Sequence, residues 1–405
     1  MRKNEKKENG RVASFDQDIF FLILGAESRA AEIAWPKTPL CQLYDKIRLL
    51  IMSVSLSDCN DYSQARYVWG DSGDMVRVAV VGGGVNAIGS ALALLQRAPE
   101  CQVTVISKDF SPNTTGVYTR TCTPPLFSLS RRWSQETWDL LLGWVKAGQQ
   151  KGVSLVSGAC VGRSELPLEF WHKIPIGYRT LTQEECTIYG PDYCSGYSFT
   201  SIIAEPSNFL PRLMNELRDR GVVFKKQRLT SLEEAAAHAD LVLNCTGLGA
   251  YDLVPDHNMY PCRGQVMRVK APWQTTFLCD DSDENIAYIL PNCESVVLGG
   301  TNQDDDWRQE IDPKDSEAIW NNCTRLVPSL KKAEIVREWA GLRPCRRKGV
   351  RLEADEVKIG SRNIPVVHNY GHGGCGVTMF WGCSKETASI AVDLIHKHFG
   401  PISKL

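Results

Sequence analysis

Three small residues stand at a spacing that suits the binding of a phosphate group. Gly82, Gly84 and Ala87 form a G-x-G-x-x-A pattern. The first glycine permits a tight turn, the second lets the backbone approach a phosphate, and the third small residue lets a helix pack on the preceding strand. Free N–H groups at the start of that helix would bind the anion. The pattern predicts a dinucleotide site, but alone it does not distinguish NAD, NADP and FAD.

The elements on either side of this pattern make it more specific. A valine-rich run over 76–81 predicts a buried strand, and it is followed by a predicted helix over 87–97 and a second strand over 102–107. In such a unit the second strand normally ends in an acid that binds a ribose. Here Lys108 occupies that place and Asp109 comes one position later. The ribose contact is therefore open, with Asp109 as the candidate.

Strands and helices continue to alternate along the body of the chain, which predicts an α/β fold. Helices are expected over 132–147, 208–220, 231–238 and about 376–398, and strands over 222–226, 239–245, 265–269, 286–290, 295–298 and 364–368.

Composition excludes several classes of function. The chain has 405 residues, a formal net charge of −1 and no apolar run of the roughly 18 to 20 residues that a membrane span needs. A nucleic-acid-binding protein would need a clustered basic face, so neither nucleic acid nor membrane is an expected partner.

Acidic residues interrupt the basic N-terminal stretch, which argues against a signal peptide. Fifteen scattered cysteines without a C-x-x-C pair predict reduced thiols and no metal site.

The two ends of the chain differ in character from the body. Residues 1–74 show no sustained period, and Met75 stands directly before the first predicted strand, so we expect 1–74 to be a poorly ordered extension. The chain ends in Ser403, Lys404 and Leu405, an S-K-L tripeptide that is a peroxisomal import address. We therefore expect a peroxisomal matrix protein that binds the peroxisomal import receptor.

From Met75 onward the chain resembles the D-amino-acid oxidase and D-aspartate oxidase family of flavoproteins. The motifs that resemble the family are V-V-G-G-G-V at 80–85, D-F-S-P-N-T-T at 109–115, N-C-T-G at 244–247, R-G-Q-V at 263–266, V-L-G-G-T at 297–301, G-L-R-P at 341–344 and V-H-N-Y-G-H-G-G at 367–374.

This resemblance implies a Rossmann-like FAD-binding domain with an interleaved antiparallel-sheet substrate domain. The FAD-binding parts would be about 75–160, 221–255 and 362–399, and the substrate-domain parts about 161–220 and 256–361. The implied reaction is oxidative deamination of a D-amino acid, in which FAD and molecular oxygen serve as acceptors. The products would be a keto acid, ammonia and hydrogen peroxide.

The resemblance also implies which residues contact the cofactor. The segment from Gly373 to Thr378 would open the last helix, whose positive end would face the flavin ring and favour the negative charge of its reduced form. The full set of implied cofactor contacts is Gly82, Gly84, Val85, Asp109, Thr114, Thr115, Leu229, Thr246, Gly373, Gly374, Gly376 and Thr378.

Three residues are implied as substrate contacts. Arg343 matches the family arginine that binds the α-carboxylate, a role suited to a planar guanidinium, which pairs with a carboxylate through two hydrogen bonds. Tyr288 matches a tyrosine that supplies a hydroxyl to the same carboxylate, and Gly374 lies in the motif beside them. No side chain is assigned as a general acid or base, because an amine bound in its neutral form needs none.

The chain departs from the family pattern at positions that bear on activity. An unrelated segment over 116–130 replaces the family's small-residue and aromatic stretch. Cys279 and Asn302 stand where the acidic-substrate branch has arginines, and Glu284 stands where the neutral-substrate branch has a second tyrosine. Arg346, Arg347 and Lys348 are possible substitutes, although a basic surface run is the simpler interpretation.

These departures leave two other functions open beside a D-amino-acid or D-aspartate oxidase. One is a related flavin amine oxidase that acts on glycine or sarcosine. The other is a catalytically silent flavin-fold protein, suggested by the altered 116–130 segment. The preference for acidic or neutral substrates and the oligomeric state also stay open at this point.

Overall fold

The fold is given by a computed structural model. It describes residues 75–111, 113–114, 128–148, 152–166, 171–282 and 286–400, together with the backbone of 67–68 and 403–404. The predicted 1–74 extension therefore lies outside the described residues except for two positions. Thr115, the altered segment up to Phe127, Glu284 and Leu405 also lie outside them.

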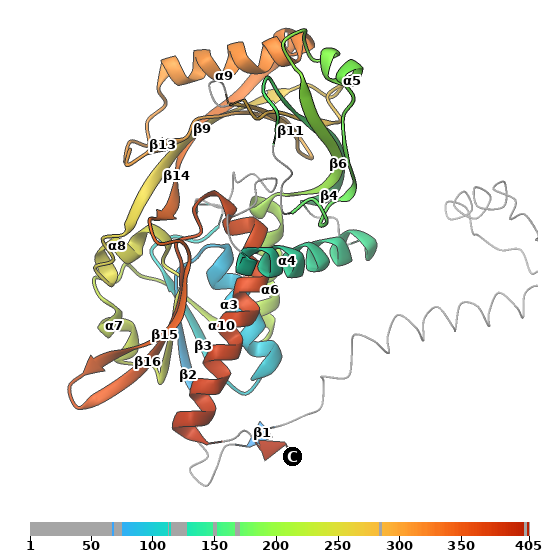
Figure 1. The fold of residues 1–405 in the computed structure, drawn as a ribbon. Coiled ribbons are helices and arrows are strands. Elements are labelled where there is room, and N and C mark those ends of the chain that lie inside the picture. Colours follow the sequence, from blue (N-terminus) through green and yellow to red (C-terminus); the bar gives the residue numbers. More distant parts are fainter. Residues whose placement is uncertain are drawn as a thin grey trace, which may run out of the picture. The chain divides into compact units, whose positions relative to one another are not determined.

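A six-stranded sheet forms the first layer (Figure 1). Its order is β15 (Arg351–Ile359), β16 (Arg362–Tyr370), β8 (Leu241–Asn244), β2 (Arg77–Val81), β3 (Gln102–Ser107) and β7 (Val223–Lys226). The five strands from β16 to β7 pair in parallel, whereas β15 and β16 form an antiparallel hairpin. Parallel strands are normally covered on both faces, which explains why β2 and β8 are apolar along nearly their whole length.

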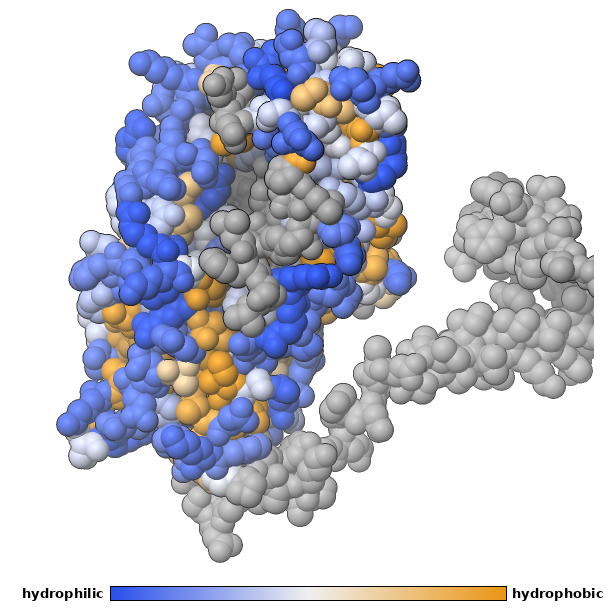
Figure 2. Space-filling view, viewed as in Figure 1, coloured by the Kyte–Doolittle hydropathy of each residue, from blue (hydrophilic) through white to orange (hydrophobic). Residues whose placement is uncertain are grey.

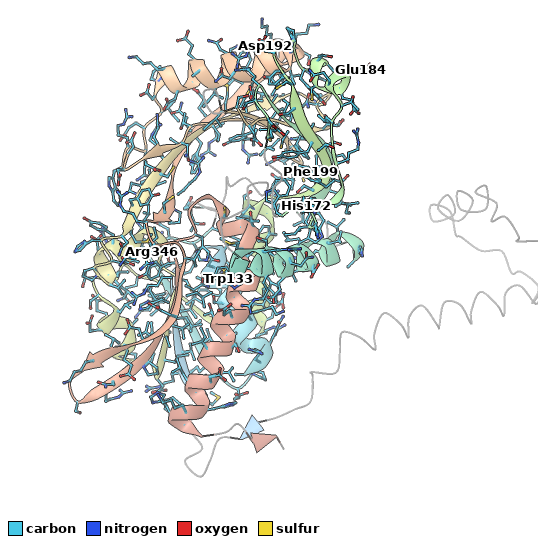
Figure 3. The ribbon with its side chains drawn as sticks, viewed as in Figure 1. Trp133, His172, Glu184, Asp192, Phe199 and Arg346 are labelled. Atoms are coloured by element: carbon cyan, nitrogen blue, oxygen red, sulfur yellow. The ribbon has the colours of Figure 1, made fainter. Side chains whose placement is uncertain are left out.

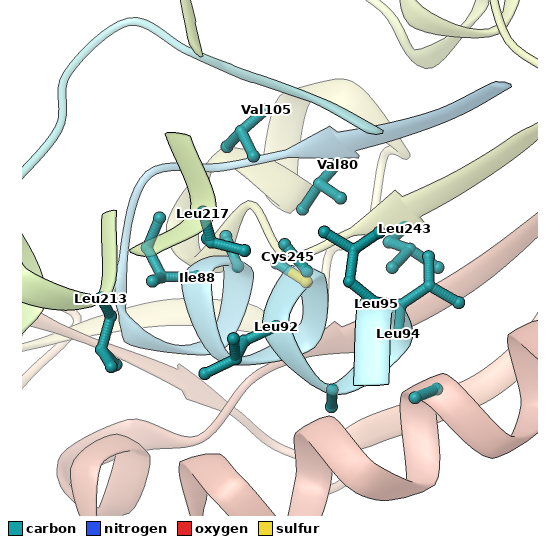
Figure 4. Packing of buried hydrophobic residues seen from close by; sticks show 14 of the residues in the cluster. Val80, Ile88, Leu92, Leu94, Leu95, Val105, Leu213, Leu217, Leu243 and Cys245 are labelled. Carbon is teal, nitrogen blue, oxygen red and sulfur yellow. The ribbon is translucent and has the colours of Figure 1, made fainter. Parts of the chain in front are cut away.

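Helices cover one face of this sheet and form its core. The helix α3 (Val85–Arg97) is buried from Val85 to Leu95 between the sheet, α6 (Pro206–Asp219) and α10 (Gly376–Phe399). Figure 4 shows Ile88 and Leu92 of α3 beside Leu213 and Leu217 of α6. The helix α4 (Ser128–Lys146) lies across α10, and the indole of Trp133 donates a hydrogen bond to Glu386 at 2.7 Å (Figure 3).

The second layer is a nine-stranded sheet. Its order is β13 (Gln303–Asp304), β9 (Met259–Lys270), β12 (Val296–Gly299), β11 (Ala287–Pro291), β10 (Phe277–Asp280), β4 (Val153–Gly162), β6 (Ser195–Ala204) and β5 (Ile176–Thr180), with β14 (Glu334–Arg346) paired to β9. All of these pairs are antiparallel except β10 with β4.

The two faces of the nine-stranded sheet have different roles. On one face Ile289 and Leu298 pack under α9 (Pro313–Leu326). Elsewhere, polar residues cover much of the visible surface of the molecule (Figure 2). On the other face Tyr288 packs with an aromatic group that includes Phe199 and Trp171. Side chains alternate between faces along a strand, so Tyr288 lies on the face of the sheet that is opposite to α9.

Short elements complete the described fold: α5 (Gln183–Thr187), α7 (Leu232–Ala236), η2 (Gly247–Gly249), α8 (Ala250–Leu253), η3 (Pro328–Lys332), η4 (Gly373–Cys375), and the two-residue strands β1 (Tyr67–Val68) and β17 (Ser403–Lys404). Among the described residues, no helix is both long and apolar enough to cross a membrane.

The predicted α/β fold with an interleaved antiparallel sheet is confirmed. Three elements are associated with a different sheet from the one that the approximate domain bounds implied by the resemblance would give them. β4 belongs to the nine-stranded sheet, α6 packs against α3, and β15 joins the six-stranded sheet. The contacts of α6 with α3 and the pairing partners of β4 and β15 are distant in sequence, so local patterns do not assign these elements to a sheet.

Candidate active site

The glycine turn after β2 has the geometry that the sequence pattern predicts. Gly82 adopts φ 128°, and a side-chain Cβ at this position would stand 2.4 Å from the carbonyl oxygen of Cys245. Only glycine fits such a position. Gly84 is the N-cap of α3, and a Cβ built there would meet no atom of the described residues within 4 Å. The first N–H groups of α3 therefore border open space of the kind that a phosphate occupies.

Several polar atoms near this turn are buried without a hydrogen-bond partner in the described part of the chain. They are Oδ1 of Asn86, Oγ of Ser111, Oγ1 of Thr114 and Oγ1 of Thr378. Buried polar atoms normally have partners, so a group of unpaired ones indicates a missing ligand. Donors and acceptors beside a free helix N-terminus fit FAD, which carries a pyrophosphate and polar rings. The predicted cofactor contacts Thr114 and Thr378 belong to this group.

The starts of α3 and α10 lie next to each other. The side-chain amide nitrogen (Nδ2) of Asn86 is 3.2 Å from Nδ1 of His372, and a Cβ at Gly376 would be 3.8 Å from the same nitrogen. Burial lowers the pKa of His372 to about 4, so its ring is neutral at pH 7. Its Nε2 has no partner among the described residues. Two positive helix ends and a neutral imidazole therefore border this space.

The remaining predicted cofactor contacts lie around the same sheet edge. Thr246 donates a hydrogen bond to Asn244 at 2.7 Å, and Asn244 in turn lies 2.9 Å from the ring of His368. Leu229 is half-buried and packs against a cluster of buried apolar residues that includes Ala79 and Val81 of β2. The carboxylate of Asp109 lies 3.8 Å from the Lys226 ammonium, so the acid proposed for the ribose is ion-paired across the sheet edge.

Arg343 extends from β14 on the same face of the nine-stranded sheet as Tyr288. It stands opposite Cys262 in the β14–β9 ladder, and a Cβ at Gly264 would come within 2.4 Å of its Nη2. Glycine at position 264 therefore makes room for the guanidinium. Within the described residues, all hydrogen bonds of this guanidinium come from Nη1, the shortest of them to the carbonyl oxygen of Thr301 at 3.1 Å. Nη2 and Nε are left to bind a carboxylate.

Two further glycines make room for Tyr288. It pairs with Gly299 across β11 and β12, and a Cβ at Gly300 would stand 2.4 Å from its hydroxyl oxygen. The next residue is Thr301, whose carbonyl holds Arg343. The turn over 299–301 thus contacts both predicted substrate residues and brings them to one place.

The two layers meet at Arg343. A Cβ at Gly374 would be 3.4 Å from Cδ of Arg343, and Cys345 forms an isolated bridge with His372. The predicted substrate arginine therefore lies directly against the glycine segment that opens α10. This contact joins the substrate side to the cofactor side.

Two of the basic residues considered as substitutes for the missing arginines are already paired. Arg346 forms a buried ion pair with Asp256 at 2.7 Å, and Arg347 pairs with Asp305 at 2.9 Å. Burial alone would raise the pKa of Asp256, but hydrogen bonds from Arg346, Asn258 and Tyr370 together hold it below its ordinary value. The interpretation of 346–348 as a surface run is therefore wrong for Arg346, whose side chain is only 13% exposed.

Cys279 and Asn302, the other two departures, differ in position. Cys279 is fully buried in the aromatic cluster around Tyr288. Asn302 accepts hydrogen bonds from Arg343 at 3.4 Å and from the Cys262 thiol at 2.9 Å. Neither position supplies a positive charge to the substrate side.

Sequence reasoning missed a buried network that supports this site. Arg263 is fully buried and pairs with Asp315 of α9 at 2.6 Å, while the Gln265 amide donates to Ser316 at 2.8 Å. These contacts fix β9, which carries Cys262 and Gly264 on its opposite face. The R-G-Q-V motif was the signal, but its side chains point to α9 and not to the ligand.

Comparison with known proteins agrees with this geometry. A family model described as FAD dependent oxidoreductase (DAO) matches residues 77–390. The D-aspartate oxidase of Homo sapiens is 36% identical over 82% of this chain and 99% of its own length. The D-amino-acid oxidase of Rubrobacter xylanophilus is 36% identical over 78% of this chain and 96% of its own.

A similar fold is seen in solved structures. Glycine oxidase from Bacillus cereus superposes with a TM-score of 0.61 at 18% identity, covering 82% of this chain and 99% of that one. At this identity the likeness shows the fold alone.

Proposed function

Since the chain belongs to the FAD-dependent oxidoreductase family (DAO), we propose that it is an oxidase of D-amino acids whose final electron acceptor is molecular oxygen. The products are a keto acid, ammonia and hydrogen peroxide. The contact between Arg343 and Gly374 is the observation that supports this proposal most strongly, because it brings a guanidinium, which can pair with a carboxylate, beside the segment that opens α10. The two relatives that are 36% identical bear the names of such oxidases.

The chain holds FAD mainly with backbone groups. The first turn of α3, beginning at Gly84, binds the pyrophosphate, and Thr114 and Thr378 supply hydroxyls. The start of α10 at Gly376 would present its positive end to a bound flavin. A bound FAD would supply the two-electron acceptor that the oxidation of the substrate needs.

The substrate is oriented by side chains. Arg343 binds the α-carboxylate through its two nitrogen atoms that make no hydrogen bond within the described residues, and Tyr288 adds its hydroxyl. Fixing the carboxylate fixes the position of Cα, which lowers the entropic part of the barrier. Our proposal assigns no side-chain acid or base, because the substrate amine is bound in its neutral form.

A substrate panel tests this proposal against its alternatives. The full chain is purified, its flavin content per chain is measured, and peroxide release is followed with D-alanine, D-aspartate, L-alanine, glycine and sarcosine. Flavin with peroxide release from a D-amino acid supports the proposal. Release from glycine or sarcosine alone points to the related amine oxidases. A flavin-free, inactive chain points to the silent protein.

The panel also separates acidic from neutral substrates. A substrate carboxylate in a buried site needs a paired charge. Cys279 and Asn302 are uncharged, and Arg346 and Arg347 already pair with Asp256 and Asp305. We therefore expect a higher kcat/KM for D-alanine than for D-aspartate, and the reverse order would contradict this part of the proposal.

We further propose that the protein is imported into peroxisomes through Ser403, Lys404 and Leu405. A fluorescent protein fused ahead of residues 396–405 should enter peroxisomes. The same fusion without Leu405 should stay in the cytosol. A diffuse signal from the intact fusion would reject this localisation.

A further inference from the structure

Two cysteines lie beside the substrate arginine without a role in the proposed reaction. Cys262 of β9 stands opposite Arg343 in the β9–β14 ladder, and Cys345 lies two positions further along β14. Alternate residues of a strand share one face, so Cys262, Arg343 and Cys345 lie on the same side of the sheet. All twelve cysteines in the described part of the chain are free thiols.

The two thiols are in contact with each other and with the site. Cys345 donates a hydrogen bond to the sulfur of Cys262. The Cys262 sulfur lies 3.6 Å from Nη1 of Arg343 and 2.9 Å from Oδ1 of Asn302. A Cβ at Gly373 would be 3.2 Å from the Cys345 sulfur. The pair therefore lies between the substrate arginine and the start of α10.

The surroundings favour a reactive sulfur at Cys262. The hydrogen bond from Cys345 lowers the pKa of the Cys262 thiol, and the charge of Arg343 lowers it further. Burial and a hydrogen bond with Asp304 act in the opposite direction but do not outweigh these effects. The same hydrogen bond raises the pKa of Cys345. Cys262, whose thiol donates to Oδ1 of Asn302 in the resting site, is thus the thiol of the pair that ionises more easily, and Cys345 keeps its proton.

We propose that Cys262 and Cys345 form a peroxide-sensitive thiol pair that reports on the output of the adjacent site. This inference rests on the proposed function, because the oxidant is the hydrogen peroxide that the oxidase reaction releases. A reactive sulfur beside a second thiol is the arrangement of reversible thiol sensors.

The chemistry proceeds in two steps. The Cys262 thiolate attacks one oxygen of peroxide, so that an S–O bond forms, the O–O bond breaks, and hydroxide leaves and is protonated to water. The sulfur of Cys345 then loses its proton and attacks the Cys262 sulfur. The S–S bond forms, the S–O bond breaks, and the departing hydroxide takes up the proton as a second water. Two electrons pass from the thiol pair to one peroxide molecule.

Oxidation has a structural consequence at Arg343. Diagonal neighbours in an antiparallel ladder have Cα atoms about 7–8 Å apart, which is longer than most disulfides span. Closing the bond therefore requires the backbone to move at Cys262 and Cys345, next to Arg343. It also removes the sulfur contact of Nη1. Substrate binding should weaken, because Arg343 contacts the Cys262 sulfur directly.

The experiment treats the purified FAD-bound full chain with hydrogen peroxide and then with dithiothreitol. In the wild type we expect a Cys262–Cys345 linked peptide by mass spectrometry. Activity should fall by about tenfold or more through a higher KM and return on reduction, in keeping with the loss of one charged hydrogen bond. A second arm lets the enzyme produce its own peroxide from D-alanine, with and without catalase.

Three variants complete the test. Cys345→Ser should leave a sulfenic acid on Cys262 that dimedone traps, and Cys262→Ser should show no reversible loss relative to its own starting activity. Cys194→Ser, which changes an exposed thiol elsewhere, should behave as the wild type. Absence of both the linked peptide and the trapped Cys262 would overturn the proposal. Peptide analysis with added peroxide needs no turnover, so failure of the thiol pair is distinguished from failure of the oxidase proposal.

Discussion

The six-stranded and the nine-stranded sheets prepare their ligand sites by different means. The first presents backbone: a left-handed glycine at 82, an open N-cap at Gly84 and the start of α10 at Gly376. The second presents long side chains, and glycines on neighbouring strands make room for Arg343 and Tyr288. Cofactor binding should therefore depend on backbone geometry and substrate binding on a few side-chain positions. Mutations can separate the two properties.

The largest expected effect is at the glycine turn. Gly82→Ala places a Cβ 2.4 Å from the Cys245 carbonyl in a backbone region that other residues rarely adopt. We expect destabilisation by several kcal/mol and loss of soluble, flavin-containing protein. Gly84→Ala is the matched control, because its Cβ meets no atom within 4 Å in the part of the chain that the structure describes. It should fold normally and bind FAD weakly. Urea unfolding of the apoproteins and flavin content measure both, and equal stability of the two variants would contradict this account.

The next effect concerns the support of the substrate sheet. Arg263→Met removes one partner of a buried ion pair and leaves Asp315 without its charge partner. Breaking such a pair typically costs about 3–5 kcal/mol. Urea unfolding should show this loss, and Arg347→Met, which breaks an exposed pair, should change stability by no more than about 1 kcal/mol. Similar losses in both variants would show that the Arg263 network does not hold β9 to α9.

Acid should weaken the cofactor side because His372 is buried in its neutral form. Its pKa is about 4 in the folded protein against about 6.5 when unfolded, so the unfolded state binds the proton first as pH falls. Stability from this residue is full above pH 6.5 and is lost as pH falls from about 6.5 to 4.

The expected loss between pH 7.5 and pH 5 is about 2 kcal/mol. His372→Gln should remove this part of the pH dependence, whereas the exposed His257→Gln should not. Urea unfolding at the two pH values checks this. A wild type and a His372→Gln variant with the same pH dependence would contradict the assignment.

A smaller, selective effect is expected at Gly264. Gly264→Ala places a methyl group 2.4 Å from Nη2 of Arg343 and displaces the guanidinium. KM for D-alanine should rise by about tenfold or more, while flavin content is unchanged. Gly143→Ala is the control, because a Cβ at this position of α4 meets no atom of the described residues within 4 Å. Loss of flavin in Gly264→Ala would break the proposed separation of the two sheets.

Local sequence patterns predicted the cofactor side better than the substrate side for a physical reason. The unit over 77–107 has a continuous apolar strand, a glycine turn and a largely apolar helix, so each signal is local. In contrast, β14 is largely exposed along its first half, and α9 was not predicted. Both depend on contacts with β9, which lies far away in the sequence.

The candidate site residues likewise depend on contacts that are distant in the sequence. Arg343 and Tyr288 were identified by motif resemblance, but their shared position at the 299–301 turn depends on strand register. The contact of Cys262 with Cys345 joins positions more than eighty residues apart, so no local pattern reports it. Motifs thus indicate candidate site residues, whereas strand register decides which of them meet.

The central claim is that Arg343 anchors the substrate without holding the cofactor. The most direct measurement compares kcat/KM for D-alanine and flavin content per chain in the wild type, Arg343→Met and Arg347→Met. We predict that Arg343→Met loses about a hundredfold or more in kcat/KM, in line with the removal of a charged pair, and keeps its flavin. Arg347→Met should match the wild type. An unchanged kcat/KM in Arg343→Met, or a loss of flavin equal to its loss of activity, would contradict the account.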